Sequence, residues 1–365
     1  MRRIAFYKSI VRLCRGNARA ASMPHFWKRV FVTTVVIVMA AAVLQKTKPE
    51  KQYCKFGGPI FRGRHKHKPI NMNPLAPLFG YNIRWTDALL YLGVVCVMLF
   101  AAVFWVRQKV REVMFYPESP PLTTMSLPRG ESGTLVPVRP HDATESIQLV
   151  VMEPPNAAAA VLLFAHGNAG YLSKARCAML RRIANATRCT VVGFDYRGFG
   201  LSTPRGFAPT ESSILLDGTV ALNHVEQHVA RKRPIWVWGE SMGSAVAAHL
   251  AADKRVTGVV MHIGFARLAD VAPPNYAILN SICLALLADS LDNAGRLALS
   301  AAAHKPVAMI VANDDEIMSS KTSNALEHAI RQNPARRTLR INVDGTHGTH
   351  NLDSALPQLV EFVHT

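Results

Sequence analysis

One serine of this 365-residue chain lies in a glycine-flanked turn suited to nucleophilic chemistry. The pentapeptide GESMG at 239–243 follows the apolar run IWVW and opens the helical stretch 242–252. A sharp strand-to-helix turn leaves room only for glycines beside Ser241 and presents its hydroxyl above a sheet. The helix N-terminus adds positive potential where an oxyanion would form. A bare GxSxG pattern also arises by chance or as a helix cap, so the strand–turn–helix context is what predicts a nucleophile.

A second glycine-rich turn is predicted to stabilise the oxyanion. HGNAG at 166–170 follows the apolar run VLLFA. Such a turn can direct a backbone N–H at the carbonyl oxygen of a substrate. We expect the oxyanion hole to combine the N–H groups of Asn168 and Met242. His166 is expected to pin the turn, because a serine of this kind takes its base from late in the chain.

An acid and a histidine are expected after the last two strands. Asp314 and Asp315 follow the run AMIVA, and His347 and His350 follow the run TLRINV. This is the chain order Ser…Asp…His that a serine nucleophile in such a turn requires. Either histidine is placed to accept the Ser241 proton, while a carboxylate orients the imidazole and stabilises its cation. Spacing alone leaves the choice open within each pair.

Alternating strands and helices are predicted to position these residues. Near-continuous apolar strands separated by helical patterns indicate an α/β fold, with a mostly parallel central sheet covered by helices on both faces. The predicted strands are 134–138, 147–152, 161–165, 190–194, 235–238, 256–262, 307–312 and 338–343. The predicted helices are 173–186, 210–229, 242–252, 320–333 and 352–364.

Positive charge is concentrated at the start of the chain. Residues 1–86 contain 17 Lys and Arg and one acid, whereas residues 87–365 contain 25 Lys and Arg and 23 acids. Charge flanking a membrane segment explains this distribution more simply than nucleic-acid binding, so no nucleic-acid partner is expected. The six cysteines form no CxxC pair, and no GxGxxG or Walker pattern occurs. We therefore expect neither a metal site nor another cofactor.

Two apolar segments predict attachment to a membrane. Residues 86–106 contain one charge, Asp87, and are bounded by tryptophans and a basic stop, which favours a transmembrane helix over a buried core helix. The run 30–44 would reach only about 22 Å as a helix, so it fits a signal-anchor, a signal-peptide core or a short span. Basic residues flank both segments, which leaves single- or two-pass topology, the side of the membrane and the organelle open.

The expected organisation has four parts. They are a basic N-terminal region (1–85), the transmembrane helix (86–106), a linker (107–142) and a catalytic domain (143–365). Within the domain, the apolar insertion 266–304 is a candidate lid over an acyl-chain pocket, with plain core helices as the alternative.

Five motifs in fixed order give the chain a family resemblance. HGNAG, FDYRGFGLS, GESMG, the Asp-Asp strand end and DGTH together resemble the α/β-hydrolase superfamily. Within it they are similar to the membrane-anchored α/β hydrolase domain-containing proteins, a group that includes protein depalmitoylases. The resemblance covers about residues 110–365 and implies a nucleophile at Ser241 and an oxyanion hole at Asn168 and Met242. It implies an acid at Asp315 and a base at His347, with Asp314 and His350 as alternates.

Departures from the family pattern affect the edge of the site. Asn351 follows His350, although the family usually places Asn-Asp after its catalytic histidine. Met318-Ser319-Ser320 stands where the family often has proline. These differences concern substrate preference and leave the hydrolase core unchanged.

The sequence predicts a membrane-anchored serine hydrolase of the endomembranes or plasma membrane. It would cleave an ester or thioester of a lipid or acyl-protein through an acyl-enzyme. A serine peptidase of the same fold and a non-catalytic membrane scaffold are the alternatives. Membrane lipid and the acyl substrate are the expected partners, and the oligomeric state stays open.

Overall fold

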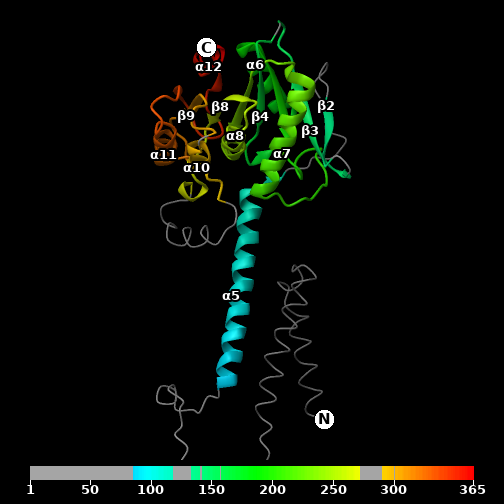
Figure 1. The fold of residues 1–365 in the computed structure, drawn as a ribbon, viewed down its shortest axis with the longest axis vertical. Coiled ribbons are helices and arrows are strands. Elements are labelled where there is room, and N and C mark those ends of the chain that lie inside the picture. Colours follow the sequence, from blue (N-terminus) through cyan, green and yellow to red (C-terminus); the bar gives the residue numbers. More distant parts are fainter. Residues whose placement is uncertain (1–84, 118–132, 140–141, 157, 272–289, 300) are drawn as a thin grey trace, which may run out of the picture. The chain divides into compact units, whose positions relative to one another are not determined.

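The computed structural model describes most of the chain beyond the basic N-terminal region (Figure 1). The described residues are 85–117, 133–139, 142–156, 158–271, 290–299 and 301–365. All of them belong to one compact unit, Leu75–Thr365. The short apolar run 30–44 lies outside the described residues.

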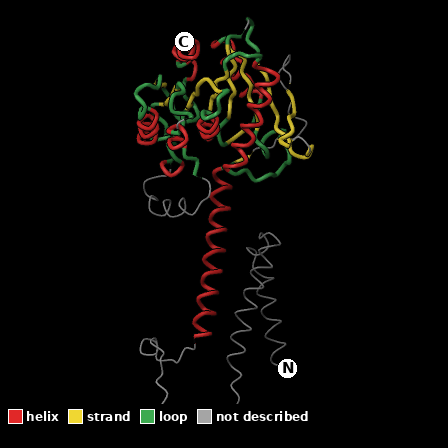
Figure 2. The backbone as a smooth tube through the Cα atoms, viewed as in Figure 1, coloured by secondary structure: helices red, strands yellow, loops and turns green. Residues whose placement is uncertain are grey.

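An eight-stranded mixed sheet forms the centre of the domain, in the order β10-β9-β8-β7-β4-β6-β3-β2. Figure 2 shows its strands in yellow among the red helices. Its strands are β2 (Gly133–Arg139), β3 (Asp142–Met152), β4 (Ala160–Ala165), β6 (Cys189–Asp195), β7 (Ile235–Glu240), β8 (Val256–His262), β9 (Val307–Ala312) and β10 (Thr338–Val343). The strands from β6 to β10 in this order pair in parallel, whereas β3 pairs antiparallel with β6 and β2. The predicted α/β fold with a mostly parallel sheet is confirmed.

Helices cover both faces of the sheet, as the apolar strands require. Buried side chains of α6 and α12 form the core on one face, and those of α7, α8, α10 and α11 form the core on the other. The helices are α6 (Lys174–Thr187), α7 (Glu211–His224), α8 (Ser244–Leu250), α10 (Asn293–Ala298), α11 (Ser320–Ile330) and α12 (Leu356–His364). The predicted helix 210–229 changes after His224 into a π-helical turn, Val225–Ala230.

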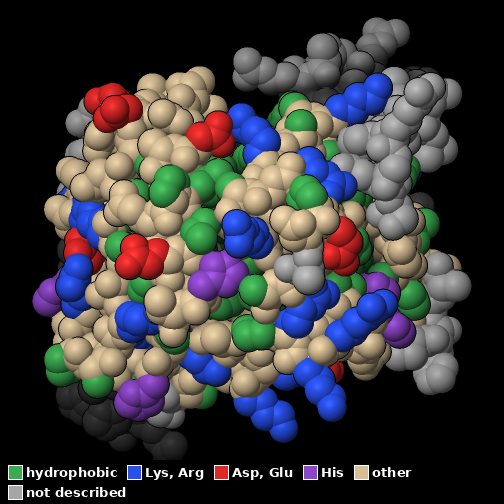
Figure 3. Space-filling model, turned by 90° about the horizontal axis from the view of Figure 1, so that it is seen from above, with side chains coloured by type: hydrophobic (Ala, Val, Ile, Leu, Met, Phe, Trp, Pro, Cys, Tyr) green, Lys and Arg blue, Asp and Glu red, His purple; other side chains and the backbone are tan. Residues whose placement is uncertain are grey.

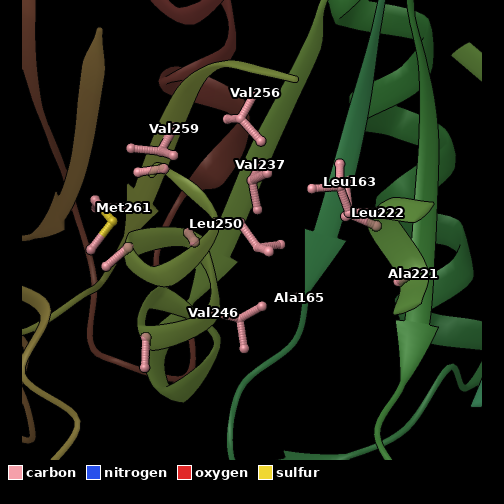
Figure 4. Packing of buried hydrophobic residues seen from close by; sticks show 14 of the residues in the cluster. Leu163, Ala165, Ala221, Leu222, Val237, Val246, Leu250, Val256, Val259 and Met261 are labelled. Carbon is pink, nitrogen blue, oxygen red and sulfur yellow. The ribbon is translucent and has the colours of Figure 1, made fainter. Parts of the chain in front are cut away.

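The helix that follows the candidate nucleophile packs on the middle of the sheet. Val246 and Leu250 of α8 lie against Val237 of β7 and Val259 of β8, and all four side chains are buried (Figure 4). Complete burial of each such aliphatic side chain contributes about 1.5–3 kcal/mol. This packing fixes the start of α8, and therefore the turn before it, against the sheet.

The apolar segment forms a long helix, α5 (Trp85–Met114). Within the described residues, its stretch Thr86–Trp105 is the one that is long and apolar enough to cross a membrane, and none of that stretch is buried. The helix continues beyond residue 106, and β1 (Tyr116–Pro117) and β2 also lie in the expected linker 107–142. Residues 107–114 are mostly good helix formers, so the helix extends past the apolar run.

Basic and acidic side chains are both present on the surface of the domain. Figure 3 shows basic and acidic side chains scattered over one face among other side chains. The excess positive charge therefore belongs to residues 1–86, as the composition indicates.

Candidate active site

The candidate nucleophile occupies a sharp turn between β7 and α8. Ser241 opens a 3-10 turn, Ser241–Gly243, and its φ of 50° lies in the left-handed region. A Cβ at Gly239 would lie 2.2 Å from the carbonyl oxygen of Gly243, and one at Gly243 would lie 2.1 Å from that of Ala165. Because the opposing atoms belong to the backbone, both positions require glycine. The turn thus presents the serine at the carboxyl end of the sheet.

Ser241, His347 and Asp315 form a hydrogen-bonded chain. The Oγ of Ser241 lies 3.0 Å from Nε2 of His347, and Nδ1 of His347 lies 2.8 Å from Oδ2 of Asp315. The first distance allows proton transfer between the serine and the imidazole, and the second allows the carboxylate to orient the ring. Asp314 is exposed, and its backbone N–H donates to the carbonyl of Gly345. The geometry therefore selects Asp315 from the acidic pair.

The carboxylate of Asp315 is kept ionised by its surroundings. Burial opposes ionisation, but the hydrogen bond to His347 and the backbone N–H groups of Met318 and Ile317 hold its pKa below the ordinary value. Glu316 fixes the other side of the loop by accepting the backbone N–H of His347 at 3.1 Å. His347 is thus held both at its imidazole ring and at its backbone N–H.

The alternate base, His350, has a different set of contacts. Its Nε2 lies 2.6 Å from Nε2 of His262, and its Nδ1 lies 3.1 Å from the carbonyl oxygen of His347. Burial lowers the pKa of His262 to about 3 despite the nearby Glu240 carboxylate. A neutral His262 can donate from Nε2 to His350, whose Nδ1–H then donates to the His347 carbonyl. His350 therefore supports the loop that carries His347.

The HGNAG turn lies directly beside the nucleophile. A Cβ at Gly167 would come within 3.3 Å of the Ser241 Cβ. Nδ1 of His166 lies 2.7 Å from the carbonyl oxygen of Gly167, and the hydroxyl of Tyr196 donates to the His166 carbonyl at 2.9 Å. His166 is fully buried. These contacts fit the structural role expected of this histidine.

A cavity of about 740 Å³ opens above the serine. Asn168 and Met242, the two expected oxyanion donors, both line it, together with His347. Its apolar lining consists of Met179, Ile263, Phe265, Leu268, Val271, Leu291, Ile317, Met318 and Leu352. Leu268, Val271 and Leu291 flank the central part of the insertion 266–304, residues 272–289, which is outside the described residues. The cavity thus has a large apolar part next to the hydroxyl.

Sequence reasoning missed an ion pair at the cavity wall. Arg176 of α6 pairs with Glu240, the residue before the nucleophile, and Glu240 also accepts the backbone N–H of Gly167 at 3.3 Å. Burial disfavours the charged carboxyl, but the Arg176 guanidinium overcomes this and lowers the pKa of Glu240 to about 2. An acidic residue directly before the buried Ser241 indicates that a cation is needed nearby. No pattern in the sequence identifies that cation as Arg176, which lies 64 residues from Glu240.

Replacing Arg176 by Met is expected to reduce the free energy of unfolding by about 2–3 kcal/mol at neutral pH. Glu240 has a folded-state pKa of about 2 against an ordinary value of 4.5, so its contribution is complete above pH 4.5 and is lost as the pH falls towards 2. Urea unfolding at several pH values would therefore show the gap between variant and wild type narrowing below pH 4.5. The matched control is Arg182→Met, which breaks an exposed pair with Asp353. It should change stability by less than about 0.5 kcal/mol. A gap that stays constant down to pH 3 would contradict the assignment.

Among the described residues, no group of three or more His, Cys, Asp or Glu side chains has the arrangement of a metal site.

Comparison with known proteins gives one matching family model and several similar proteins. The Hydrolase_4 family model, described as serine aminopeptidase S33, matches residues 156–328. An uncharacterized protein of Mycobacterium tuberculosis (strain H37Rv) is 26% identical over 242 residues, which cover 66% of this chain and 82% of that protein. Protein bem46 of Schizosaccharomyces pombe is 32% identical over 115 residues, covering 31% of this chain and 37% of bem46. Lysophosphatidylserine lipase ABHD12 of Danio rerio is 33% identical over 90 residues, but the match covers only 25% of this chain and 22% of the lipase.

Solved structures share the fold at low sequence identity. An α/β hydrolase from Vibrio vulnificus superposes with a TM-score of 0.55 at 14% identity, covering 72% of this chain and 93% of that structure. An esterase from Pyrococcus furiosus superposes with a TM-score of 0.50 at 12% identity, covering 68% of this chain and 97% of the esterase. At these identities the likeness concerns the fold.

Proposed function

Because the chain belongs to the α/β-hydrolase superfamily and is a serine hydrolase, we propose that it is a membrane-anchored enzyme that cleaves carboxylic esters or thioesters of apolar acyl chains. One observation carries the proposal. Ser241, His347 and Asp315 form a continuous hydrogen-bonded chain whose serine end opens into a largely apolar cavity. One of the similar proteins, ABHD12, is a lysophosphatidylserine lipase, which agrees with this chemistry.

The proposed reaction proceeds through an acyl-enzyme. Ser241 Oγ attacks the acyl carbon while its proton passes to Nε2 of His347, and Asp315 stabilises the imidazolium. The N–H groups of Asn168 and Met242 donate hydrogen bonds to the developing oxyanion. The bond to the leaving alcohol or thiol then breaks, and the leaving group takes the proton from His347. Water attacks the acyl-enzyme with His347 as base, which releases the carboxylic acid and restores the serine.

An aminopeptidase is the second candidate, because the matching family model carries that description. An aminopeptidase needs an anionic group to bind the free amine of its substrate. Among the described residues that line the cavity, Glu240 is the one acid, and Arg176 already neutralises it. The cavity therefore favours an acyl chain over the charged end of a peptide.

The proposal includes attachment to a membrane through α5. The exposed apolar stretch of α5 would span the bilayer and hold residues 143–365 beside it, at an endomembrane or the plasma membrane. Membrane attachment supports a bilayer-resident acyl substrate, either a lipid or an acylated protein. The insertion 266–304 would act as a lid, since two of its described residues, Leu268 and Leu291, line the apolar cavity.

Activity profiling of the purified full chain in detergent tests the proposal. A fluorophosphonate probe should label the wild type and leave Ser241→Ala unlabelled. Aryl esters and acyl thioesters should be hydrolysed, faster with longer acyl chains, and peptide amides should not. Turnover of peptide amides alone would establish the aminopeptidase instead. Absence of both labelling and turnover would leave a membrane scaffold, and equal labelling of both proteins would exclude Ser241 as the nucleophile.

A further inference from the structure

A short parallel strand pair links the end of α5 to the turn beside the nucleophile. β1 (Tyr116–Pro117) begins two residues after α5 ends at Met114 and pairs with β5 (Ala169–Gly170). β5 lies inside the HGNAG motif. The stretch that leaves the apolar helix therefore runs alongside the turn that we assign to the oxyanion hole.

Two contacts hold this pair in place. The backbone N–H of Tyr116 donates to Oδ1 of Asn168 at 2.8 Å. Phe115, the preceding residue, is 2% exposed and belongs to the core on the α7 and α8 side of the sheet. A pair of two-residue strands is not stable alone. Burial of Phe115 and the side chain of Asn168 therefore determine where β1 lies.

The turn is thus held from two directions. On the nucleophile side, Glu240 accepts the backbone N–H of Gly167 at 3.3 Å. On the α5 side, Tyr116 binds the side chain of Asn168, the residue whose own backbone N–H is assigned to the oxyanion. A displacement of about 1 Å in such a donor can reduce the rate about 100-fold. Because the Tyr116 side chain is exposed, only its backbone can supply this restraint.

We propose that residues 115–117 are a positioning segment for catalysis, in which the backbone N–H of Tyr116 holds the oxyanion turn through Asn168. The inference rests on the proposed function and adds to it. The junction between the apolar helix and the domain becomes part of the arrangement that stabilises the transition state. Tyr116 is a positioning residue, since it touches Asn168 and not the reacting atoms.

The test compares a variant that lacks the Tyr116 backbone N–H with a matched variant that keeps it. Tyr116→Pro in the full chain removes the donor, whereas Tyr116→Ala removes the exposed ring and keeps the donor. With a water-soluble aryl ester in detergent, Tyr116→Pro should lower kcat per labelled serine about 10- to 100-fold and change KM less than threefold. Tyr116→Ala should retain at least half of kcat. Equal kcat in the Pro variant and the wild type would overturn the proposal.

A further variant separates this role from simple misfolding. Asn168→Leu removes the acceptor and should reproduce the Pro variant. Affinity for a trifluoromethyl ketone, which mimics the tetrahedral oxyanion, should fall in parallel with kcat/KM. A purely structural role would lower the unfolding midpoint and the labelled fraction while kcat per labelled serine stayed constant, and that result would also overturn the proposal. If Ser241→Ala remained active, the proposed function would fail instead.

Discussion

Alanine at either Ser241 or His347 is expected to lower kcat/KM for an activated ester by a factor of about 10⁴–10⁶. The serine supplies the nucleophile, and His347, at 3.0 Å, is the group that removes its proton. Because the two act as one unit, the double variant should be no slower than either single variant. Steady-state rates of the three proteins, corrected for folded fraction, give the comparison. Additive losses would show that the two residues act separately.

The matched control is His350→Ala, three residues along the same loop. His350 contacts His262 and the His347 carbonyl, so it supports the loop and is not expected to take the serine proton. We expect its loss to cost about tenfold or less in kcat/KM. A loss in His350→Ala as deep as that in His347→Ala would reopen the assignment of the base.

Replacing Arg197 by Met is expected to destabilise the domain by about 3–5 kcal/mol. Arg197 is 4% exposed, and its Nε and backbone N–H donate to the fully buried carboxylate of Asp217 at 2.7 and 2.9 Å. Its guanidinium also binds Glu145 of β3 at 2.7 Å. The substitution would leave a carboxylate buried without its cation. Thermal unfolding should show a midpoint lower by about 10 °C.

Arg331→Met provides the comparison for this effect. Arg331 forms an exposed pair with Glu327 one helical turn away, and such pairs contribute little to stability. The thermal unfolding midpoint of Arg331→Met should stay within about 2 °C of the wild-type value. The double variant Arg197→Met/Asp217→Leu should recover part of the lost stability, because no buried charge then lacks a partner. A midpoint near the wild type in Arg197→Met alone would contradict the predicted cost of leaving Asp217 without its cation.

Local patterns in the sequence were sufficient for the sheet and the nucleophile turn. Apolar runs bounded by turns mark strands wherever both faces of a sheet are covered, and all eight predicted strands occur. Their bounds differ from the expected ones by at most two residues, except that β3 begins at Asp142 and not at residue 147. The turn at Ser241 was predictable because its glycines, its strand and its helix are contiguous. Asp315 and His347 were predicted on resemblance, since spacing could not separate them from Asp314 and His350.

What the sequence could not predict depends on contacts between distant residues. Arg176 meets Glu240, and Arg197 meets Asp217, only after the sheet and helices have assembled. Side-chain direction separates His347 from His350, and a loop has no periodicity from which direction can be inferred. β1 and β5 are two residues long, which is too short for any alternation of apolar and polar residues.

The left-handed backbone at Ser241 sets stability against chemistry. A non-glycine residue in this region costs about 1–3 kcal/mol, a cost that glycine at position 241 would not carry. Substitution to glycine would therefore relax the backbone and remove the hydroxyl in one step. The turn thus gives up stability at the position where the proposed reaction needs a side chain.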